Sequence, residues 1–186
     1  MELYSIDELQ SLLGGVGVNV QIDRSVKFIS PKNIYIGSNV RIDSWCFISG
    51  AAGVTIGNNV HIAHAAHLFG NGASIEIHDF CGISSRVSIF TSTDDYSEGW
   101  LTNPTIPNQY RKVKSAPVVF QKHVIVGCGS VVMPGCVLKT GASVGALSFV
   151  NKSVPEYAIV SGNPIRLIGK RDQNRLQTLE KEYVNK

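Results

Sequence analysis

Two adjacent carboxylates and three aromatic residues lie close together in one polar segment of the chain. Asp94 and Asp95 are followed by Tyr96, Trp100 and Tyr110, in a stretch rich in turn-forming residues. Carboxylates can accept protons, and aromatic rings offer flat faces to a polar ligand. The pattern predicts catalysis and substrate binding in one loop. A solvated loop with packing aromatics, or a subunit contact, is the alternative interpretation.

Histidines form a second candidate group. His61, His64, His67 and His78 lie within eighteen residues of one another, and His64, in the sequence HIAHAAH, is the first choice among them for a general base. Their spacing of three would suit a metal on a helix, but along an extended coil such residues point in different directions. No metal site is therefore predicted. His123 is expected at the surface.

The positive charge is concentrated near the C-terminus. Up to Asn151 the chain has ten Lys or Arg and ten Asp or Glu, and afterwards seven basic residues face four acidic ones. The formal net charge of +3 therefore arises entirely after Asn151. An anionic ligand would be attracted to this end. Nucleic acid is a poorer fit, because the basic patch is small and has no interleaved aromatic residues.

An apolar residue recurs at every sixth position over most of the chain. From Phe120 the hexads read FQKHVI, VGCGSV, VMPGCV, LKTGAS and VGALSF, and the register runs back to Val16. Breaks of two or three residues follow every third hexad, and one of about twenty-five follows Ile89. Neither a helix nor simple strand alternation gives a strict period of six, whereas a hexapeptide β-helix does. The pattern predicts an all-β solenoid, a parallel β-helix of about six three-hexad coils.

The position four residues after each opening residue is mostly small or Val, as the narrow interior of such a coil requires. Cys46, Ala52, Cys81 and Cys136 occupy this inward position. The three cysteines are therefore interpreted as core filler, and their spacing matches no zinc pattern. Cys128 falls elsewhere in its hexad and is expected to be partly exposed.

Shorter elements flank and interrupt the coil. Ser5 and Glu8 have the spacing of a helix capping box, and a last helix is predicted from about Arg171 to Val184. The predicted parts are a capping helix at 1–15, the coil at 16–155 with its loop insertion at about 91–117, and a C-terminal extension at 156–186. No stretch is long enough to span a membrane and the sequence MELYSIDELQ lacks a secretory signal, so a cytoplasmic protein is expected.

The ladder, the long loop after the fourth coil and the closing sequence VGALSFVNKSVPEYAIVSGNPIRLIGK together resemble the hexapeptide-repeat acyltransferases. Within them the chain is most similar to the branch of galactoside and maltose O-acetyltransferases and nucleotide-sugar N-acetyltransferases. The resemblance extends from Val16 to about Arg171. It implies a left-handed parallel β-helix, a homotrimer with active sites between subunits, and transfer of an acetyl group from acetyl-CoA to a hydroxyl or amine.

The resemblance also implies where coenzyme A would bind. Backbone amides around Gly145 and Ala146 would follow the pantetheine arm, Lys152 would meet phosphate, and Arg166 would reach the nucleotide end. Ser161 and Lys170 complete the expected CoA-binding set. Lys and Arg suit phosphate groups, although a solvated surface charge is the alternative interpretation of Lys152 and Arg166.

One departure from the family concerns the general base. O-acetyltransferases of this branch have a histidine near the start of the long loop, where this chain has Asp94. A carboxylate, with an ordinary pKa of about 4, is a weak base toward a hydroxyl, whereas a neutral amine is already nucleophilic. The expected function is therefore N-acetylation of a nucleotide-linked amino sugar for surface-polysaccharide assembly. An O-acetyltransferase acting on a sugar hydroxyl is the alternative, and a γ-carbonic-anhydrase-like or non-catalytic β-helix is a more distant one.

Overall fold

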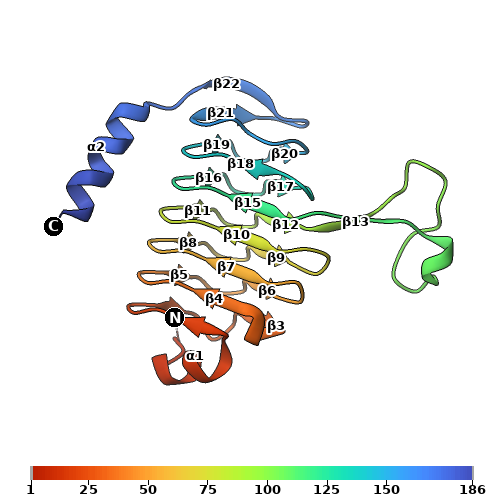
Figure 1. Ribbon diagram of the computed structural model, residues 1–186, viewed down its shortest axis with the longest axis horizontal. Helices are drawn as coiled ribbons and strands as arrows, with labels where there is room; N and C mark the ends of the chain where they lie inside the picture. The colour runs from red at the N-terminus through yellow and green to blue at the C-terminus, as the bar shows by residue number, and fades with distance from the viewer. Residues whose placement is uncertain (1, 186) are drawn as a thin grey trace.

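The computed structural model describes residues 2–185 and consists of a three-sided parallel β-helix with a long arm and two terminal helices (Figure 1). The first sheet contains β1 (Gly15–Val16), β4 (Ile34–Ile36), β7 (Val54–Ile56), β10 (Ile75–Ile77), β15 (Val118–Phe120) and β18 (Val137–Leu138). The second contains β2 (Gln21–Ile22), β5 (Arg41–Ile42), β8 (His61–Ile62), β11 (Gly82–Ile83), β16 (Ile125–Val126), β19 (Ser143–Val144), β21 (Ala158–Ser161) and β22 (Arg166–Lys170). The third contains β3 (Lys27–Ile29), β6 (Phe47–Ser49), β9 (His67–Phe69), β12 (Ser88–Phe90), β17 (Val131–Val132) and β20 (Phe149–Val150).

The strand register stacks the predicted inward residues into continuous columns. Ile42, Ile62 and Ile83 are successive partners across parallel strands of the second sheet, and none is more than 1% exposed. Because every hexad opener enters the same interior, the sixfold period of the sequence becomes a continuous hydrophobic core. The parallel β-helix predicted from the ladder is confirmed.

The structure corrects two details of the ladder. Ala52, predicted to point inward, is exposed, because it lies in the turn closed by a hydrogen bond from Gly53 N to Gly50 O. The coil also continues past the predicted boundary at 155. A seventh coil starts where Val154 forms a parallel bridge with Leu138, and β21 continues it by pairing in parallel with β19. Strand β22 then pairs antiparallel with β21.

Three cysteines fill the core as predicted. Cys46, Cys81 and Cys136 are buried free thiols, and Cys128 is partly exposed. Burial raises the pKa of Cys46 to about 11 and that of Cys81 to about 12. These two thiols therefore remain protonated and act as small hydrophobic residues.

Helix α1 (Ile6–Leu12) closes the N-terminal end of the coil. The Ser5 hydroxyl accepts a hydrogen bond from Glu8 N, and the Glu8 carboxylate accepts one from Ser5 N, which completes the predicted capping box. Leu9 and Leu13 are buried against the first coil. The helix thereby covers apolar surface that an open coil end would expose.

Helix α2 (Gln173–Val184) lies beside the coils near the C-terminus (Figure 1). Its Glu180 Oε2 lies 2.8 Å from His123 Nε2, and Tyr183 donates a hydrogen bond to Asn59 Oδ1 at 3.0 Å. His123 stacks on Phe80 and is only 9% exposed. The prediction of a surface position for His123 is therefore wrong, because α2 covers it.

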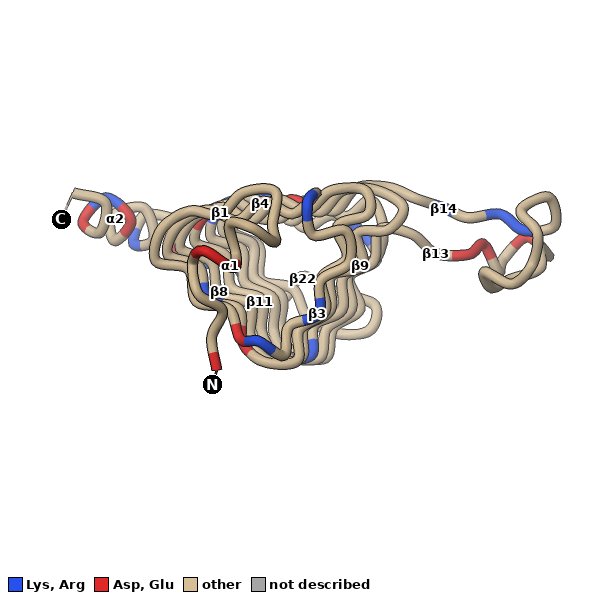
Figure 2. Tube along the Cα trace, turned by 90° about the horizontal axis from the view of Figure 1, so that it is seen from below, with Lys and Arg blue, Asp and Glu red and all other residues tan. Residues whose placement is uncertain are grey.

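The insertion forms an arm that projects from the coil. Strand β13 (Ser92–Asp94) pairs antiparallel with β14 (Val113–Ser115), and a short 3-10 helix, η2 (Asn108–Tyr110), lies in the loop between them. Figures 1 and 2 both show this arm, residues 92–115, extending away from the strands of the second sheet. No helix among residues 2–185 is long and apolar enough to cross a membrane.

Candidate active site

Asp94 ends the first strand of the arm with one carboxylate oxygen uncommitted. Its Oδ2 accepts a hydrogen bond from Asn103 N at 2.9 Å. Its Oδ1 is buried and has no hydrogen-bond partner among the described residues. Asp94 also lines a polar hollow of about 200 Å³ at this end of β13. The backbone contact therefore orients the carboxylate and leaves an oxygen that could accept a proton.

Asp95 is held very differently from Asp94. It is 2% exposed, and its Oδ1 accepts hydrogen bonds from Ser97 N at 3.0 Å and from the Ser97 hydroxyl at 2.7 Å. Its Oδ2 lies 2.9 Å from Lys114 Nζ. The Ser97 hydrogen bonds and the Lys114 ammonium hold the pKa of Asp95 well below its usual range. This geometry favours a structural role in shaping the arm, because a carboxylate so stabilised is a poor proton acceptor.

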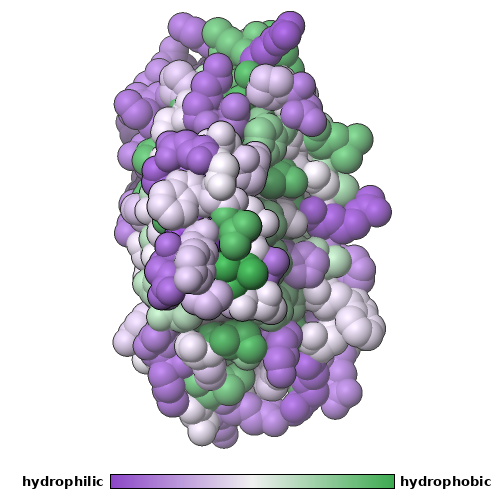
Figure 3. Space-filling view, turned by 90° about the vertical axis from the view of Figure 1, so that its right-hand side faces the viewer, coloured by the Kyte–Doolittle hydropathy of each residue, from purple (hydrophilic) through white to green (hydrophobic). Residues whose placement is uncertain are grey.

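The three predicted aromatic residues of the arm are all accessible. Tyr96 is 75% exposed, Trp100 is 42% exposed and Tyr110 is 53% exposed. Figure 3 looks onto the arm and shows apolar side chains among polar ones on this face. The rings are therefore available to a ligand or to another protein chain.

The expected CoA-binding residues gather on the last coils. Gly145 lies so close to Ser161 that a Cβ at position 145 would meet the Ser161 hydroxyl at 2.6 Å. Ser161 is in turn the cross-strand partner of Arg166. The Gly145 N–H donates a hydrogen bond to Val160 O at 2.8 Å, so this amide already pairs with the next coil. Ala146 is exposed in the adjoining turn.

The two expected lysines lie at the edge of this group. Lys152 is exposed in the segment that follows β20. Lys170 is exposed at the far end of β22, opposite Ala158. The structure therefore brings together Gly145, Ser161 and Arg166, and places Lys170 at the other end of the same strand pair.

The candidate histidines do not form one cluster. His64 is exposed, and its Nδ1 lies 3.0 Å from the Ser44 hydroxyl. His61 Nε2 lies 2.8 Å from Asp43 Oδ2, and the His67 ring stacks on Phe69. Among residues 2–185 no group of three or more His, Cys, Asp or Glu is arranged to hold a metal ion.

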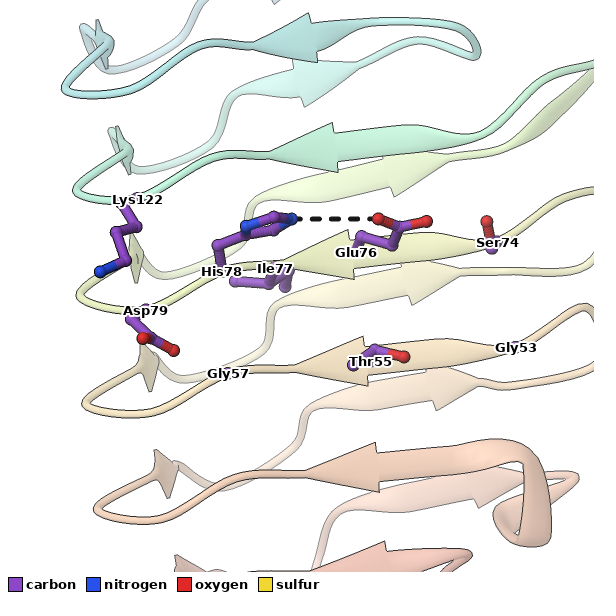
Figure 4. A pocket seen from close by; sticks show the side chains of 9 residues that line it. All are labelled: Gly53, Thr55, Gly57, Ser74, Glu76, Ile77, His78, Asp79 and Lys122. Carbon is purple, nitrogen blue, oxygen red and sulfur yellow. Dashed lines mark ion pairs between the residues drawn. The ribbon is translucent and has the colours of Figure 1, made fainter.

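His78 lines a separate hollow of about 380 Å³ on the first sheet. Figure 4 shows His78 beside Glu76, where His78 Nε2 lies 3.9 Å from Glu76 Oε2. Asp79 and Lys122 lie at the end of the hollow that is farther from Glu76. Apart from His78, one of the four candidate histidines, this hollow contains none of the residues predicted for catalysis or CoA binding. It therefore lies apart from the candidate active site.

A further hollow, of about 280 Å³, opens on the outer face of the second sheet. It is lined by side chains from three successive coils, with Gly82 at its centre and Ser84 and Ser85 in the turn after β11. Its lining also includes the partly exposed thiol of Cys128. We call it the Gly82 hollow.

Comparison with known proteins gives the relationship of the chain. It is 40% identical over 176 residues to dTDP-4-amino-4,6-dideoxy-D-glucose acyltransferase of Escherichia coli. The aligned region covers 92% of this chain and 91% of that protein. The chain belongs to the hexapeptide-repeat acyltransferases. The family predicted from the residue pattern is thereby confirmed. No family model matches the chain.

Solved structures of related acyltransferases extend this relationship. The Ser84→Thr variant of AntD, an N-acyltransferase from Bacillus cereus, was solved in complex with dTDP and coenzyme A and superposes with a TM-score of 0.94, at 40% identity, over 99% of this chain and 97% of that chain. AntD has also been solved with 3-hydroxybutyryl-CoA and as variants at its Ser84 and Asp94. A maltose O-acetyltransferase from Clostridium difficile, 24% identical with a TM-score of 0.59 over 90% of this chain and 74% of that chain, shares the fold. The left-handed β-helix fold class is consistent with these matches.

Ser84 is a residue that the sequence pattern did not single out. Serine is common in turns, and nothing in its hexad distinguishes it from Ser44 or Ser85. Its place in the lining of the Gly82 hollow is what distinguishes it in the structure. A hollow on the sheet surface carries no periodic signal in the sequence.

Proposed function

We propose that this acyltransferase transfers an acetyl group from acetyl-CoA to the amino group of a dTDP-linked 4-amino-4,6-dideoxy sugar. The observation that carries the proposal is Asp94, whose oriented carboxylate keeps a free oxygen in the arm. This chain has Asp at 94 and Ser at 84, the same residue types and numbers as the two positions varied in AntD. A role in surface-polysaccharide assembly follows from the acceptor class.

The chemistry suits an amine acceptor. The neutral amine nitrogen attacks the thioester carbonyl, the carbon–nitrogen bond forms, and the carbon–sulfur bond then breaks to release the CoA thiolate. The nitrogen becomes acidic only after attack, and the Asp94 carboxylate accepts its proton. Backbone N–H groups stabilise the oxyanion, and the proton finally neutralises the CoA thiolate. Asp95 shapes the arm through Ser97 and Lys114.

One chain alone does not assemble this site. The arm, with Asp94, extends away from the second sheet, where Ser84 lines the Gly82 hollow (Figures 1 and 2). We therefore infer a homotrimer in which the arm of one copy reaches the hollow of the next. CoA would lie along the last coils, with Ala146 and Ser161 beside the pantetheine and Lys152, Arg166 and Lys170 at its phosphates. The aromatic residues Tyr96, Trp100 and Tyr110 would contact the nucleotide-linked sugar.

The reaction is tested by measuring free CoA thiol released from acetyl-CoA. One acceptor panel contains dTDP-4-amino-4,6-dideoxyglucose and related 3-amino and 4-amino sugars, and the other contains galactosides with hydroxyls only. We expect turnover with the amino sugars, loss of most of it in Asp94→Asn, and a new amide in the product by mass spectrometry. Ser97→Ala serves as the matched control, because it weakens the Asp95 network and leaves the Asp94 contact unchanged.

Two results would overturn the proposal. Turnover with hydroxyl acceptors alone would identify a sugar O-acetyltransferase, and His64 would then be the first base to examine. Full activity of Asp94→Asn with amino sugars would remove Asp94 from proton transfer.

The proposed site also fits a cytoplasmic enzyme, since acyl-CoA and nucleotide-linked sugars are cytoplasmic metabolites.

A further inference from the structure

A hollow of about 230 Å³ lies between helix α2 and the corner of the coil that the helix covers. Its walls include Phe80, Leu176 and Leu179, and His123 and Glu180, which contact each other, also line it. We call it the α2 hollow. Because its lining is mostly apolar, it suits an aliphatic side chain better than a charged ligand.

Polar contacts hold α2 in place while its apolar side chains stay accessible. Arg171 Nη1 donates a hydrogen bond to His123 O at 2.7 Å just before the helix begins, in addition to the contact made by Glu180. Within residues 173–184, however, no residue is buried, and Leu179 is 43% exposed. The helix therefore keeps an apolar surface that a partner could cover.

The arm and α2 lie at the same level on opposite sides of the coil (Figures 1 and 2). The arm leaves the fourth coil after β12. Helix α2 contacts corner residues of the third, fourth and fifth coils, namely Asn59, Phe80 and His123. Rotation about an axis parallel to the coil keeps every residue at its own level, so in a ring of copies the arm of one meets the next where α2 lies.

Spans along the chain agree with this placement. Phe80, in the α2 hollow, precedes Ser84, in the Gly82 hollow, by four residues on one coil, a span of at most about 14 Å. On the arm, Asn103 contacts the Asp94 carboxylate, and Leu101 is two residues away, at most about 7 Å along the chain. Leu101 is 56% exposed. An arm that places Asp94 at Ser84 therefore carries Leu101 within reach of the α2 hollow.

We propose that Leu101 of one copy packs into the α2 hollow of the next copy, so that α2 is the docking surface that positions the neighbouring arm and its Asp94. The inference rests on the homotrimer of the proposed function and adds the surface that holds the arm. The aliphatic side chain of Leu101 complements the walls formed by Phe80, Leu176 and Leu179. Burial of a leucine is worth at least about tenfold in the docking equilibrium.

The test is disulfide formation between copies. Leu101→Cys and Leu179→Cys are combined in a Cys128→Ser background, since the other three cysteines are buried. After mild oxidation we expect covalent dimers and trimers in non-reducing electrophoresis, and their loss on reduction. A bond within one chain is excluded, because the arm and α2 lie on opposite sides of the coil. Leu101→Cys with Val184→Cys is the matched control and should give little cross-linking, because Val184 lies on α2 outside the α2 hollow.

Activity provides a second readout. Leu179→Asp should lower kcat/KM for dTDP-4-amino-4,6-dideoxyglucose about tenfold, and Leu101→Ser should have a similar effect. The double variant should be no less active than either single variant, because both changes remove the same contact. Val184→Asp, which also places a charge on α2, should keep wild-type activity.

The outcomes separate this inference from the proposed function. Absence of the cross-link between positions 101 and 179 in folded trimers overturns the docking surface alone, as does equal cross-linking to position 184. A cross-link at 101 and 179 in a protein whose wild type never acylates amino sugars overturns the proposed reaction and leaves the docking surface. A monomeric wild type overturns both the homotrimer and this inference. If Leu179→Cys fails to fold in melting curves, Leu176→Cys, which lines the same hollow, takes its place.

Discussion

Because successive coils are closely packed at Gly127, we predict that a larger residue there lowers the stability of the protein. Residue 127 follows β16, directly beside the turn at Gly145 and Ala146 in the next coil. A Cβ at 127 would lie 2.5 Å from Ala146 N, 2.8 Å from Ala146 Cα and 2.8 Å from Gly145 C. All three are backbone atoms, so no side-chain rotation can relieve the overlap. Gly127→Ala must therefore push two coils apart.

The size of the effect follows from two opposing contributions. Overpacking of this kind costs about 1–3 kcal/mol, and the rigid backbone partners favour the upper half of that range. Replacing Gly by Ala stabilises a protein by about 0.4–1 kcal/mol through the unfolded chain. The net loss is therefore about 1–2 kcal/mol, which lowers the Tm of a chain of this length by roughly 2–8 °C.

Gly82→Ala provides the matched control, because its Cβ meets nothing closer than 3.7 Å. Only the unfolded-chain contribution applies there, so its Tm should stay level or rise by roughly 1–4 °C. Both variants and the wild type are melted at one protein concentration, since the Tm of an oligomer depends on concentration. An unchanged or raised Tm in Gly127→Ala would refute the reasoning from coil spacing.

Three further predictions concern other parts of the chain. Hydrogen bonds from Arg24 and Ser5 lower the pKa of Glu8 to about 2, so the stabilisation of α1 by the Glu8 carboxylate is present at neutral pH and is lost as the pH falls from about 4.5 toward 2. Glu8→Gln should flatten the dependence of Tm on pH in that window. A dependence as steep as that of the wild type would contradict this prediction. Glu180→Gln should speed hydrogen exchange in α2 by weakening its contact with His123, whereas Glu182→Gln, on the same helix, should not; equal rates in both variants would count against the contact. Lys152→Gln and Arg166→Gln should each weaken CoA binding about tenfold, as measured by calorimetry. Lys27→Gln, on the third sheet, is the control and should leave the affinity unchanged. An unchanged affinity in Lys152→Gln or Arg166→Gln would remove that residue from the CoA site.

The fold was largely predictable because its signal is repeated. Each inward residue occupies an equivalent place in its coil, so columns such as Ile42, Ile62 and Ile83 appear in the sequence as a fixed period. The prediction failed where the period breaks. Ala52 falls in a corner with extra residues, and β21 resumes the coil after a break that the hexad register does not span.

The candidate active site was less predictable because its residues are distinguished by side-chain contacts and surface hollows, which leave no periodic pattern in the sequence. Asp94 and Asp95 are neighbours of the same type, and only the contacts with Asn103 and with Ser97 and Lys114 distinguish them. Ser84 is one of many turn serines, and His123 became buried because Glu180, 57 residues later, packs over it. None of these contacts is encoded in local spacing.

A subunit-mixing experiment tests the central claim, that an amino-sugar acyltransferase site forms from the arm of one copy and the Gly82 hollow of the next. Chains carrying Asp94→Asn and chains carrying Ser84→Ala are co-expressed in equal amounts, and CoA release with dTDP-4-amino-4,6-dideoxyglucose is compared with that of each variant alone. Random assembly into trimers joins an intact arm to an intact hollow at about one site in four, so we predict recovery to about a quarter of wild-type activity. Mixed trimers no more active than the single variants would contradict the shared site.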